Sequence, residues 1–156
     1  MHPVEHIESL TDIFDEFVAR AHGMVWCNLA TLDGRGRPRS RVVHPIWDGA
    51  TGWVGTVRDT PKTREIARDP HVSLAYVADV AKPVYADCLA EWVDVPSEKA
   101  RLWELFRSAP PPLGYDPASF FGSLDNPDFG LLRLMPWRVE VTNWPAGTRV
   151  WRRPER

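Results

Sequence analysis

Two tight-turn signals, Asp33-Gly34 and Asp48-Gly49, divide residues 24–57 into three segments and leave few folds open to the chain. An Asp-Gly pair between apolar segments is typical of the short loops that join neighbouring strands of a β-hairpin. Two hairpins in succession predict three consecutive antiparallel strands. A doubly wound sheet is therefore not expected, because its strands would alternate with helices.

The rest of the chain predicts further strands with a few helices between them. Thr60 followed by Pro61 favours a helix start, and the stretch 109–128, rich in Pro, Gly and Asp, predicts a long ordered loop. The expected helices are 9–21, 61–68 and 96–106, and the expected strands are 24–32, 39–47, 52–57, 71–77, 84–95 and 131–141. This order predicts a mainly β fold, a Greek-key-like antiparallel barrel with peripheral helices.

The length of 156 residues, of which 44% are hydrophobic, predicts a single domain over 1–156. Its core is expected at about 9–144, and the arginine-rich segment 145–156 is interpreted as a basic, solvated tail. The net charge of −2 argues against a nucleic-acid partner. No apolar run is long enough for a membrane span, and the N-terminus lacks the pattern of a secretory signal, so we expect a cytoplasmic protein.

Four side chains between residues 41 and 63 could bind a phosphate group. Lys62 and Thr63 lie in the first turn of the helix that Thr60 is expected to cap, and helix N-termini present free N–H groups and a positive dipole end. Arg41, on a neighbouring strand, would add a second cation. The alternative is that Arg41 and Lys62 are exposed charges on the rim of a barrel.

Three short patterns follow one another in this region with matching gaps. They are Gly-x-Pro with Arg and an apolar run, an aromatic strand ending in Thr with a hydroxyl residue two before Lys, and Asp-Pro-x-Val-Ser-Leu. The matching positions are Gly36, Pro38, Arg41, Val42, Val43, Trp53, Thr56, Thr60, Lys62 and Asp69–Leu74. The series resembles the pyridoxamine 5'-phosphate oxidase-like family, the FMN-binding split β-barrels. The resemblance covers about residues 8–107 well and 109–144 more loosely.

The resemblance implies a set of cofactor-binding residues. Arg41 and Lys62 would bind the phosphate. The backbone of residues 42–44 would follow the isoalloxazine edge, and Gly55 and Thr56 would lie under the ring and ribityl chain. The full set expected to bind the cofactor is Arg41, Val42, Val43, His44, Gly55, Thr56, Thr60, Lys62, Thr63 and Tyr85.

The resemblance also implies a homodimer that holds each flavin between two subunits. Tyr85 stands where the family usually has the Gln that contacts the flavin across the dimer. The implied coenzyme is FMN, although some relatives use a deazaflavin coenzyme, and these residues leave that choice open. Haem is not expected, since no histidine has a special placement.

The closing segments, Gly114–Pro117 and Leu131–Pro136, look like the general-stress-protein branch and its actinobacterial oxidoreductase relatives. The chain lacks the C-terminal Trp and Arg/His-bearing segment that grips substrate in true pyridoxamine-phosphate oxidases. Pyridoxine phosphate is therefore not the expected substrate.

A few further residues have two interpretations each. His44 could handle a proton at the flavin, as the only catalytic candidate, or it could be a barrel histidine. Trp47 and Trp53 could contact the ring or pack in the core. Cys27 and Cys88 form no Cys-x-x-Cys pair, so no metal site is predicted and both are expected to be buried.

Three functions remain open at this stage. The first is a flavin-dependent oxidoreductase acting on a small organic substrate, with the cofactor supplying the redox chemistry. The second is a non-catalytic flavin- or deazaflavin-binding protein for storage, sensing or stress protection. The third is a barrel whose site is empty, which would follow if Arg41 and Lys62 do not converge.

Overall fold

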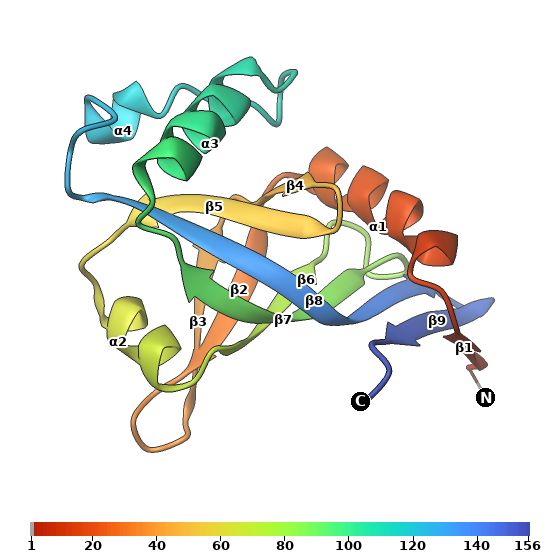
Figure 1. Ribbon diagram of the computed structural model, residues 1–156. Coiled ribbons are helices and arrows are strands. Elements are labelled where there is room, and N and C mark those ends of the chain that lie inside the picture. Colours follow the sequence, from red (N-terminus) through yellow and green to blue (C-terminus); the bar gives the residue numbers. More distant parts are fainter. Residues whose placement is uncertain (1) are drawn as a thin grey trace.

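The computed structural model describes residues 2–156, which form a mostly β domain with helices at its periphery (Figure 1). The strands are β1 (Val4–Ile7), β2 (Cys27–Leu32), β3 (Pro38–Val43), β4 (Ile46–Asp48), β5 (Thr51–Val57), β6 (His71–Tyr76), β7 (Val84–Trp92), β8 (Phe129–Asn143) and β9 (Gly147–Arg152). The helices are α1 (Thr11–Met24), α2 (Pro61–Arg68), α3 (Pro96–Ser108) and α4 (Ala118–Phe121). This confirms the expected mainly β fold.

The strands form one mixed sheet that does not close. Its order is β1-β9-β8-β7-β6-β2-β3, and β5 branches from β8 and pairs with β4. Every pairing among these strands is antiparallel except that of β1 with β9. The expected antiparallel barrel is therefore corrected at this one pair, where the chain's first strand runs alongside its last.

The main core fills the interior of the barrel, and α1 covers one end of it (Figure 1). Phe17 of α1 is fully buried, and its ring lies 5.1 Å from that of Trp47 and 6.1 Å from that of Tyr76. Trp47 also donates a hydrogen bond from Nε1 to the Tyr76 hydroxyl over 3.2 Å. The interpretation of Trp47 as a core residue is therefore confirmed, and Trp47 is not a contact for the ring of a cofactor.

A second, smaller core lies outside the barrel, where α3 and the segment 109–128 pack against β5 and β8. Trp103 and Phe121 each contact the ring of Phe129, with centroids 5.1 Å apart in both pairs. Trp53 is buried in the same cluster. Like Trp47, it is a core residue.

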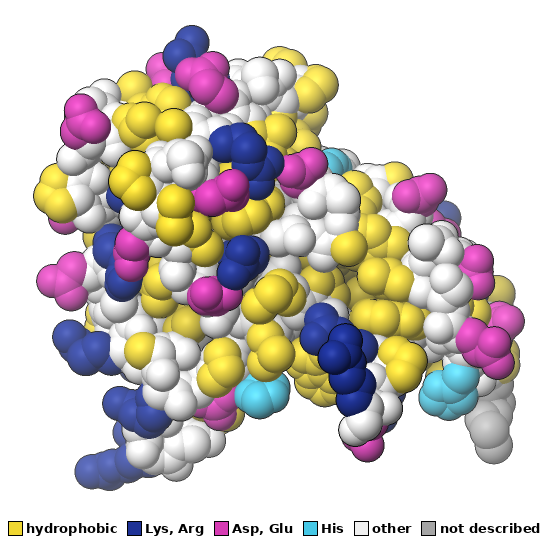
Figure 2. Space-filling view, in the orientation of Figure 1, with side chains coloured by type: hydrophobic (Ala, Val, Ile, Leu, Met, Phe, Trp, Pro, Cys, Tyr) yellow, Lys and Arg dark blue, Asp and Glu magenta, His cyan; other side chains and the backbone are white. Residues whose placement is uncertain are grey.

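Surface ion pairs connect α3 with the sheet and neighbouring strands with each other. Arg101 of α3 lies 3.0 Å from the carboxylate of Asp48, and Arg133 of β8 lies 2.5 Å from that of Glu91 on β7. On the face shown in Figure 2, positive and negative side chains are interspersed among apolar ones over most of the surface. Exposed pairs of this kind add little stability individually.

Two sequence expectations are wrong. The strand predicted over 39–47 is broken at His44 and Pro45 into β3 and β4, because proline cannot donate to a sheet ladder. Within the segment 145–156, interpreted as a solvated tail, residues 147–152 form β9 between β8 and β1. Val150 and Trp151 are buried there, and the surrounding arginines obscured that pattern in the sequence.

Candidate cofactor site

The opening in the sheet holds the candidate site. β3 is the last strand of the sheet order and pairs only with β2, and residues 54–57 of β5 pair only with β8. Both strands line one pocket of about 430 Å³, to which β3 and its continuation contribute residues 42–44. Five of the ten predicted cofactor residues line it, namely Val42, Val43, His44, Gly55 and Thr56.

Aromatic side chains form the other wall of this pocket. Tyr115 and Phe120, from the segment that the sequence predicts as a loop, lie there together with Trp26. Trp26 and Phe120 are 56% and 71% exposed, which is unusual for such large apolar side chains. Sequence reasoning gave this segment no role at the site, because no local pattern shows that it folds back over β5.

His44 lies between two aromatic rings of the pocket wall. Its ring centroid is 4.9 Å from that of Trp26 and 4.9 Å from that of Tyr115. Burial lowers the pKa of His44, and a hydrogen bond to the backbone of Leu113 opposes this only in part. The imidazole is therefore neutral near pH 7, and its proposed part in proton handling stays a prediction.

Arg41 is held by a buried carboxylate that sequence reasoning missed. It donates from Nη1 to Thr31 Oγ1 over 2.7 Å and from Nη2 to Glu65 Oε2 over 3.0 Å. Thr31 donates to the same carboxylate oxygen over 2.6 Å. The hydrogen bond from Thr31, together with the hydrogen bond and charge of Arg41, lowers the pKa of Glu65, so this carboxylate is ionised. No local pattern in the sequence indicates that Glu65 would meet Arg41, which is 24 residues away along the chain.

Lys62 is buried beside this pair, with only 6% of its surface exposed. Its Nζ donates to Thr60 Oγ1 over 3.1 Å and lies 3.5 Å from the Val57 carbonyl, and neither partner is charged. Burial and the nearby charge of Arg41 lower the pKa of Lys62. Lys62 is therefore not an exposed rim charge. Arg41 lies close enough to act on it, but neither side chain is among those that line the pocket, and phosphate binding by the pair stays a prediction.

The hydroxyls of Thr60 and Thr63 already form hydrogen bonds within the protein at the start of α2. Together they form a capping box, in which the Thr60 N–H donates to Thr63 Oγ1 over 3.3 Å. The Thr63 hydroxyl also donates to the carbonyl of Arg58. These contacts stabilise the helix end that presents Lys62, and binding of a cofactor by the two threonines stays a prediction.

Tyr85 does not line the pocket. It lies in β7 opposite Ala75 of β6, between the buried side chains of Val84 and Ala86, and is therefore on the outer face of the sheet. A contact between Tyr85 and a cofactor requires a second subunit.

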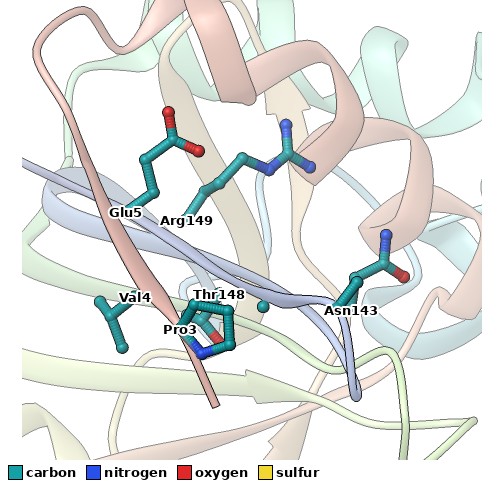
Figure 3. A pocket seen from close by; sticks show the side chains of 8 residues that line it. Pro3, Val4, Glu5, Asn143, Thr148 and Arg149 are labelled. Atoms are coloured by element: carbon teal, nitrogen blue, oxygen red, sulfur yellow. The ribbon is translucent and has the colours of Figure 1, made fainter. Parts of the chain in front are cut away.

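A second pocket, of about 290 Å³, lies at the paired chain ends and has a different character (Figure 3). Glu5 and Arg149 lie on one side of it and Asn143 on the other. It contains none of the predicted cofactor residues. Among residues 2–156, no cluster of side chains has the composition of a metal site, and no helix is long and apolar enough to cross a membrane.

The open sheet, the pocket in its gap and the adjacent cations define a split-barrel protein. A family model described as pyridoxamine 5'-phosphate oxidase matches residues 11–143. The chain belongs to this family. No curated protein sequence matches the chain significantly.

Solved structures share the fold at low sequence identity. A protein from Clostridium acetobutylicum related to general stress protein 26 is 14% identical with a TM-score of 0.74, over 90% of this chain and 94% of that one. A protein from Listeria innocua, described as a pyridoxamine 5'-phosphate oxidase, is 23% identical with a TM-score of 0.67, over 83% and 97%. At these identities the likeness establishes the fold alone.

Other neighbours differ in the ligand that their descriptions name. An FMN-binding protein from Nostoc punctiforme is 14% identical, with a TM-score of 0.60 over 86% of this chain and 84% of that one. An F420 reductase is 22% identical, with a TM-score of 0.55 over 72% and 86%. The haem storage protein HutZ from Vibrio cholerae is 22% identical, with a TM-score of 0.59 over 78% and 88%.

Proposed function

We propose that the protein binds a flavin coenzyme, FMN or a deazaflavin, in the pocket between β3 and β5 and acts as an oxidoreductase on a small organic substrate. The proposal is carried by two neighbouring cations next to the pocket: Arg41 directly precedes Val42 of its lining, and Lys62 Nζ lies 3.5 Å from the carbonyl of Val57, which also lines it. A buried lysine with only neutral hydrogen-bond partners is costly unless an anion joins it. The coenzyme's phosphate would be that anion.

The pocket lining suits the rest of such a coenzyme. The unpaired edges of β3 and β5 offer backbone N–H and C=O groups to the polar edge of a ring, and the aromatic wall offers apolar surface to its faces. When bound, the flavin would exchange a hydride or electrons with the substrate. The chain itself would orient the ring and exclude water from it.

We further propose that the working unit is a homodimer with the cofactor at the subunit interface. Large apolar side chains with high exposure border the pocket, and a second subunit would cover them. They are Trp26, Val42, Val57 and Phe120. Tyr85, on the outer sheet face, is available to reach the partner's cofactor.

A separate observation supports the non-catalytic function, ligand storage or sensing. HutZ, which is described as a haem storage protein, shares the fold, so a storage role is compatible with this architecture. Among residues 2–156, His44 is the one histidine that lines the pocket, and it lies between two aromatic rings. We therefore propose flavin storage or sensing as the second candidate.

Absorbance titration of the purified protein with FMN, with F420 and with haemin separates these functions. We expect saturable uptake of a flavin with a shifted flavin band, and no Soret band on adding haemin. Arg41→Ala and Lys62→Ala should each weaken flavin binding by about ten- to a hundredfold, since charge-assisted hydrogen bonds contribute about 1.5–3 kcal/mol. Lys99→Ala, a lysine loss on α3, is the control. Equal binding by all three variants would refute the phosphate assignment.

Turnover distinguishes the enzyme from the storage protein. A flavin-loaded protein that is reduced by a chemical donor and reoxidised by added quinones or nitroaromatics in a multiple-turnover assay supports the enzyme. Tight uptake with no turnover on any acceptor supports storage or sensing.

A further inference from the structure

Glu65 is an unexpected feature of a site meant for an anion. The residue is 7% exposed, and one oxygen, Oε2, accepts hydrogen bonds from both Thr31 and Arg41. A carboxylate beside a phosphate site repels the phosphate, so its presence there calls for an explanation.

The contacts of Arg41 leave it able to bind an anion. A guanidinium has five N–H donors in a fixed planar arrangement, and the bonds to Thr31 and Glu65 use two of them. Glu65 therefore holds Arg41 in place and leaves other N–H donors of Arg41 available to an anion. What the carboxylate changes is the charge of the site.

Three charged side chains next to this end of the pocket, of which Lys62 and Glu65 are buried and Arg41 is partly buried, carry a net charge of one, positive. Arg41 and Lys62 contribute two positive charges, and Glu65 contributes one negative charge. Arg39 of β3 also acts on Glu65, but it is exposed and its charge is screened by water. In a buried site the best-matched ligand is one whose charge balances that of the protein.

We propose that Glu65 is a specificity-determining residue that makes this site prefer a singly charged phosphodiester over a doubly charged phosphate monoester. This inference rests on the proposed flavin-binding function and deepens it. A phosphate monoester such as that of FMN carries about −1.5 to −2 charges at pH 7. The phosphate of the deazaflavin coenzyme is a diester with a single charge. Glu65 therefore favours the deazaflavin, or another diester, as the resident cofactor.

The sharpest test compares FMN with its 5'-methyl phosphodiester, which differs from it by one methyl group and by the charge of the phosphate. Both keep the isoalloxazine ring and ribityl chain, and the Glu65 variant below separates the effect of charge from that of the methyl group. Fluorescence titration of the wild-type protein should show the diester binding more tightly than FMN. Lowering the pH from about 7.5 to 5.5 protonates the monoester, whose second pKa is about 6, and should improve FMN binding while leaving the diester unchanged.

Glu65→Gln removes the charge but keeps an oxygen that can accept from Thr31 and Arg41. This variant should bind FMN roughly tenfold more tightly than the wild type does, with little change for the diester, since one repulsive charge is lost from a poorly solvated site. Glu104→Gln, on the exposed face of α3, makes the same change in net charge far from the site and should leave both affinities unchanged. Thermal melting of both variants shows whether each is folded.

The outcomes separate this inference from the function on which it rests. A wild-type preference for FMN, or an unchanged ratio of the two affinities in Glu65→Gln, would overturn the role of Glu65 while flavin binding stands. Failure of both ligands to bind would overturn the flavin function and this inference together. A ratio that shifts toward FMN in Glu65→Gln but not in Glu104→Gln supports it.

Discussion

The hydroxyl of Tyr115 lies 2.7 Å from the point that a Cβ atom on Gly55 would occupy. Phe106 approaches the same point to within 3.0 Å and Phe129 to within 3.2 Å. Glycine at position 55 is therefore required by packing, because the segment that forms the aromatic wall is pressed directly against β5. The second core and the floor of the pocket meet at this one residue.

Gly55→Ala should destabilise the protein by about 1–3 kcal/mol, the usual cost of forcing additional atoms into a packed core. It should also displace Tyr115 and so weaken flavin binding. Urea unfolding and flavin titration measure the two effects. Gly23→Ala in α1 is the matched control, since a Cβ there meets nothing within 4 Å, and that variant should be as stable as the wild type or more so.

Lys62→Met should make the cofactor-free protein more stable while weakening flavin binding as Lys62→Ala does. The lysine is buried, and burial together with the charge of Arg41 already lowers its pKa, so an apolar side chain of similar length relieves a cost of about 1–2 kcal/mol. Differential scanning calorimetry without ligand and flavin titration with it would show the two opposite changes. A cofactor-free protein that melts below the wild type would show that Lys62 is structural.

Stability should fall in mild acid because of two histidines. Burial lowers the pKa of both His22 and His44 from their ordinary value of 6.5, so between the lowered values and 6.5 the unfolded chain binds more protons than the folded one does. Stability is therefore complete above about pH 6.5 and is lost as the pH falls through the folded-state pKa values.

His22 offers the means of checking this. Its Nε2 accepts a hydrogen bond from the backbone N–H of Trp47 over 3.0 Å, which is possible only while this nitrogen carries no proton. His22→Gln replaces it with an acceptor that does not titrate, so the decline in melting temperature below pH 6.5 should be shallower. His6→Gln, on exposed β1, should retain the full slope. Identical slopes in all three proteins would contradict the assignment.

The homodimer should depend on the apolar rim of the pocket. Sedimentation is expected to give a dimer for the wild type and a monomer for Trp26→Glu, with reduced flavin affinity in the latter because the partner's wall is lost. Val80→Glu introduces the same charge at a residue that is 87% exposed and lies between β6 and β7. This control should remain dimeric, and a monomeric wild type would refute the proposed interface.

Local chemistry made much of the fold predictable. Thr60 and Pro61 mark the start of α2, and the helix runs over Pro61–Arg68 as expected. The hairpin signals at 33–34 and 48–49 lie between β2 and β3 and between β4 and β5. In these places the backbone preference of one or two residues decides the structure, so no distant contact is needed to infer it.

What escaped prediction depends on contacts between distant segments. β9 was hidden because arginines flank its apolar pair, although Val150 and Trp151 pack inward once β8 is beside it. Tyr115 reaches the site from a loop whose sequence shows only that it is a loop. Glu65 acquires its role from Thr31 and Arg41, which lie 34 and 24 residues away along the chain.

The open edge of β3 has a consequence for how the protein behaves at high concentration. An unpaired strand edge is a template on which other chains can add strands and aggregate. Here Pro38 begins the strand with a residue that has no N–H, and Arg39 places an exposed charge on it. Proline and charged side chains are the means by which natural sheets resist such growth. Addition of a strand from a neighbouring molecule is thus disfavoured at the same gap that admits a ligand.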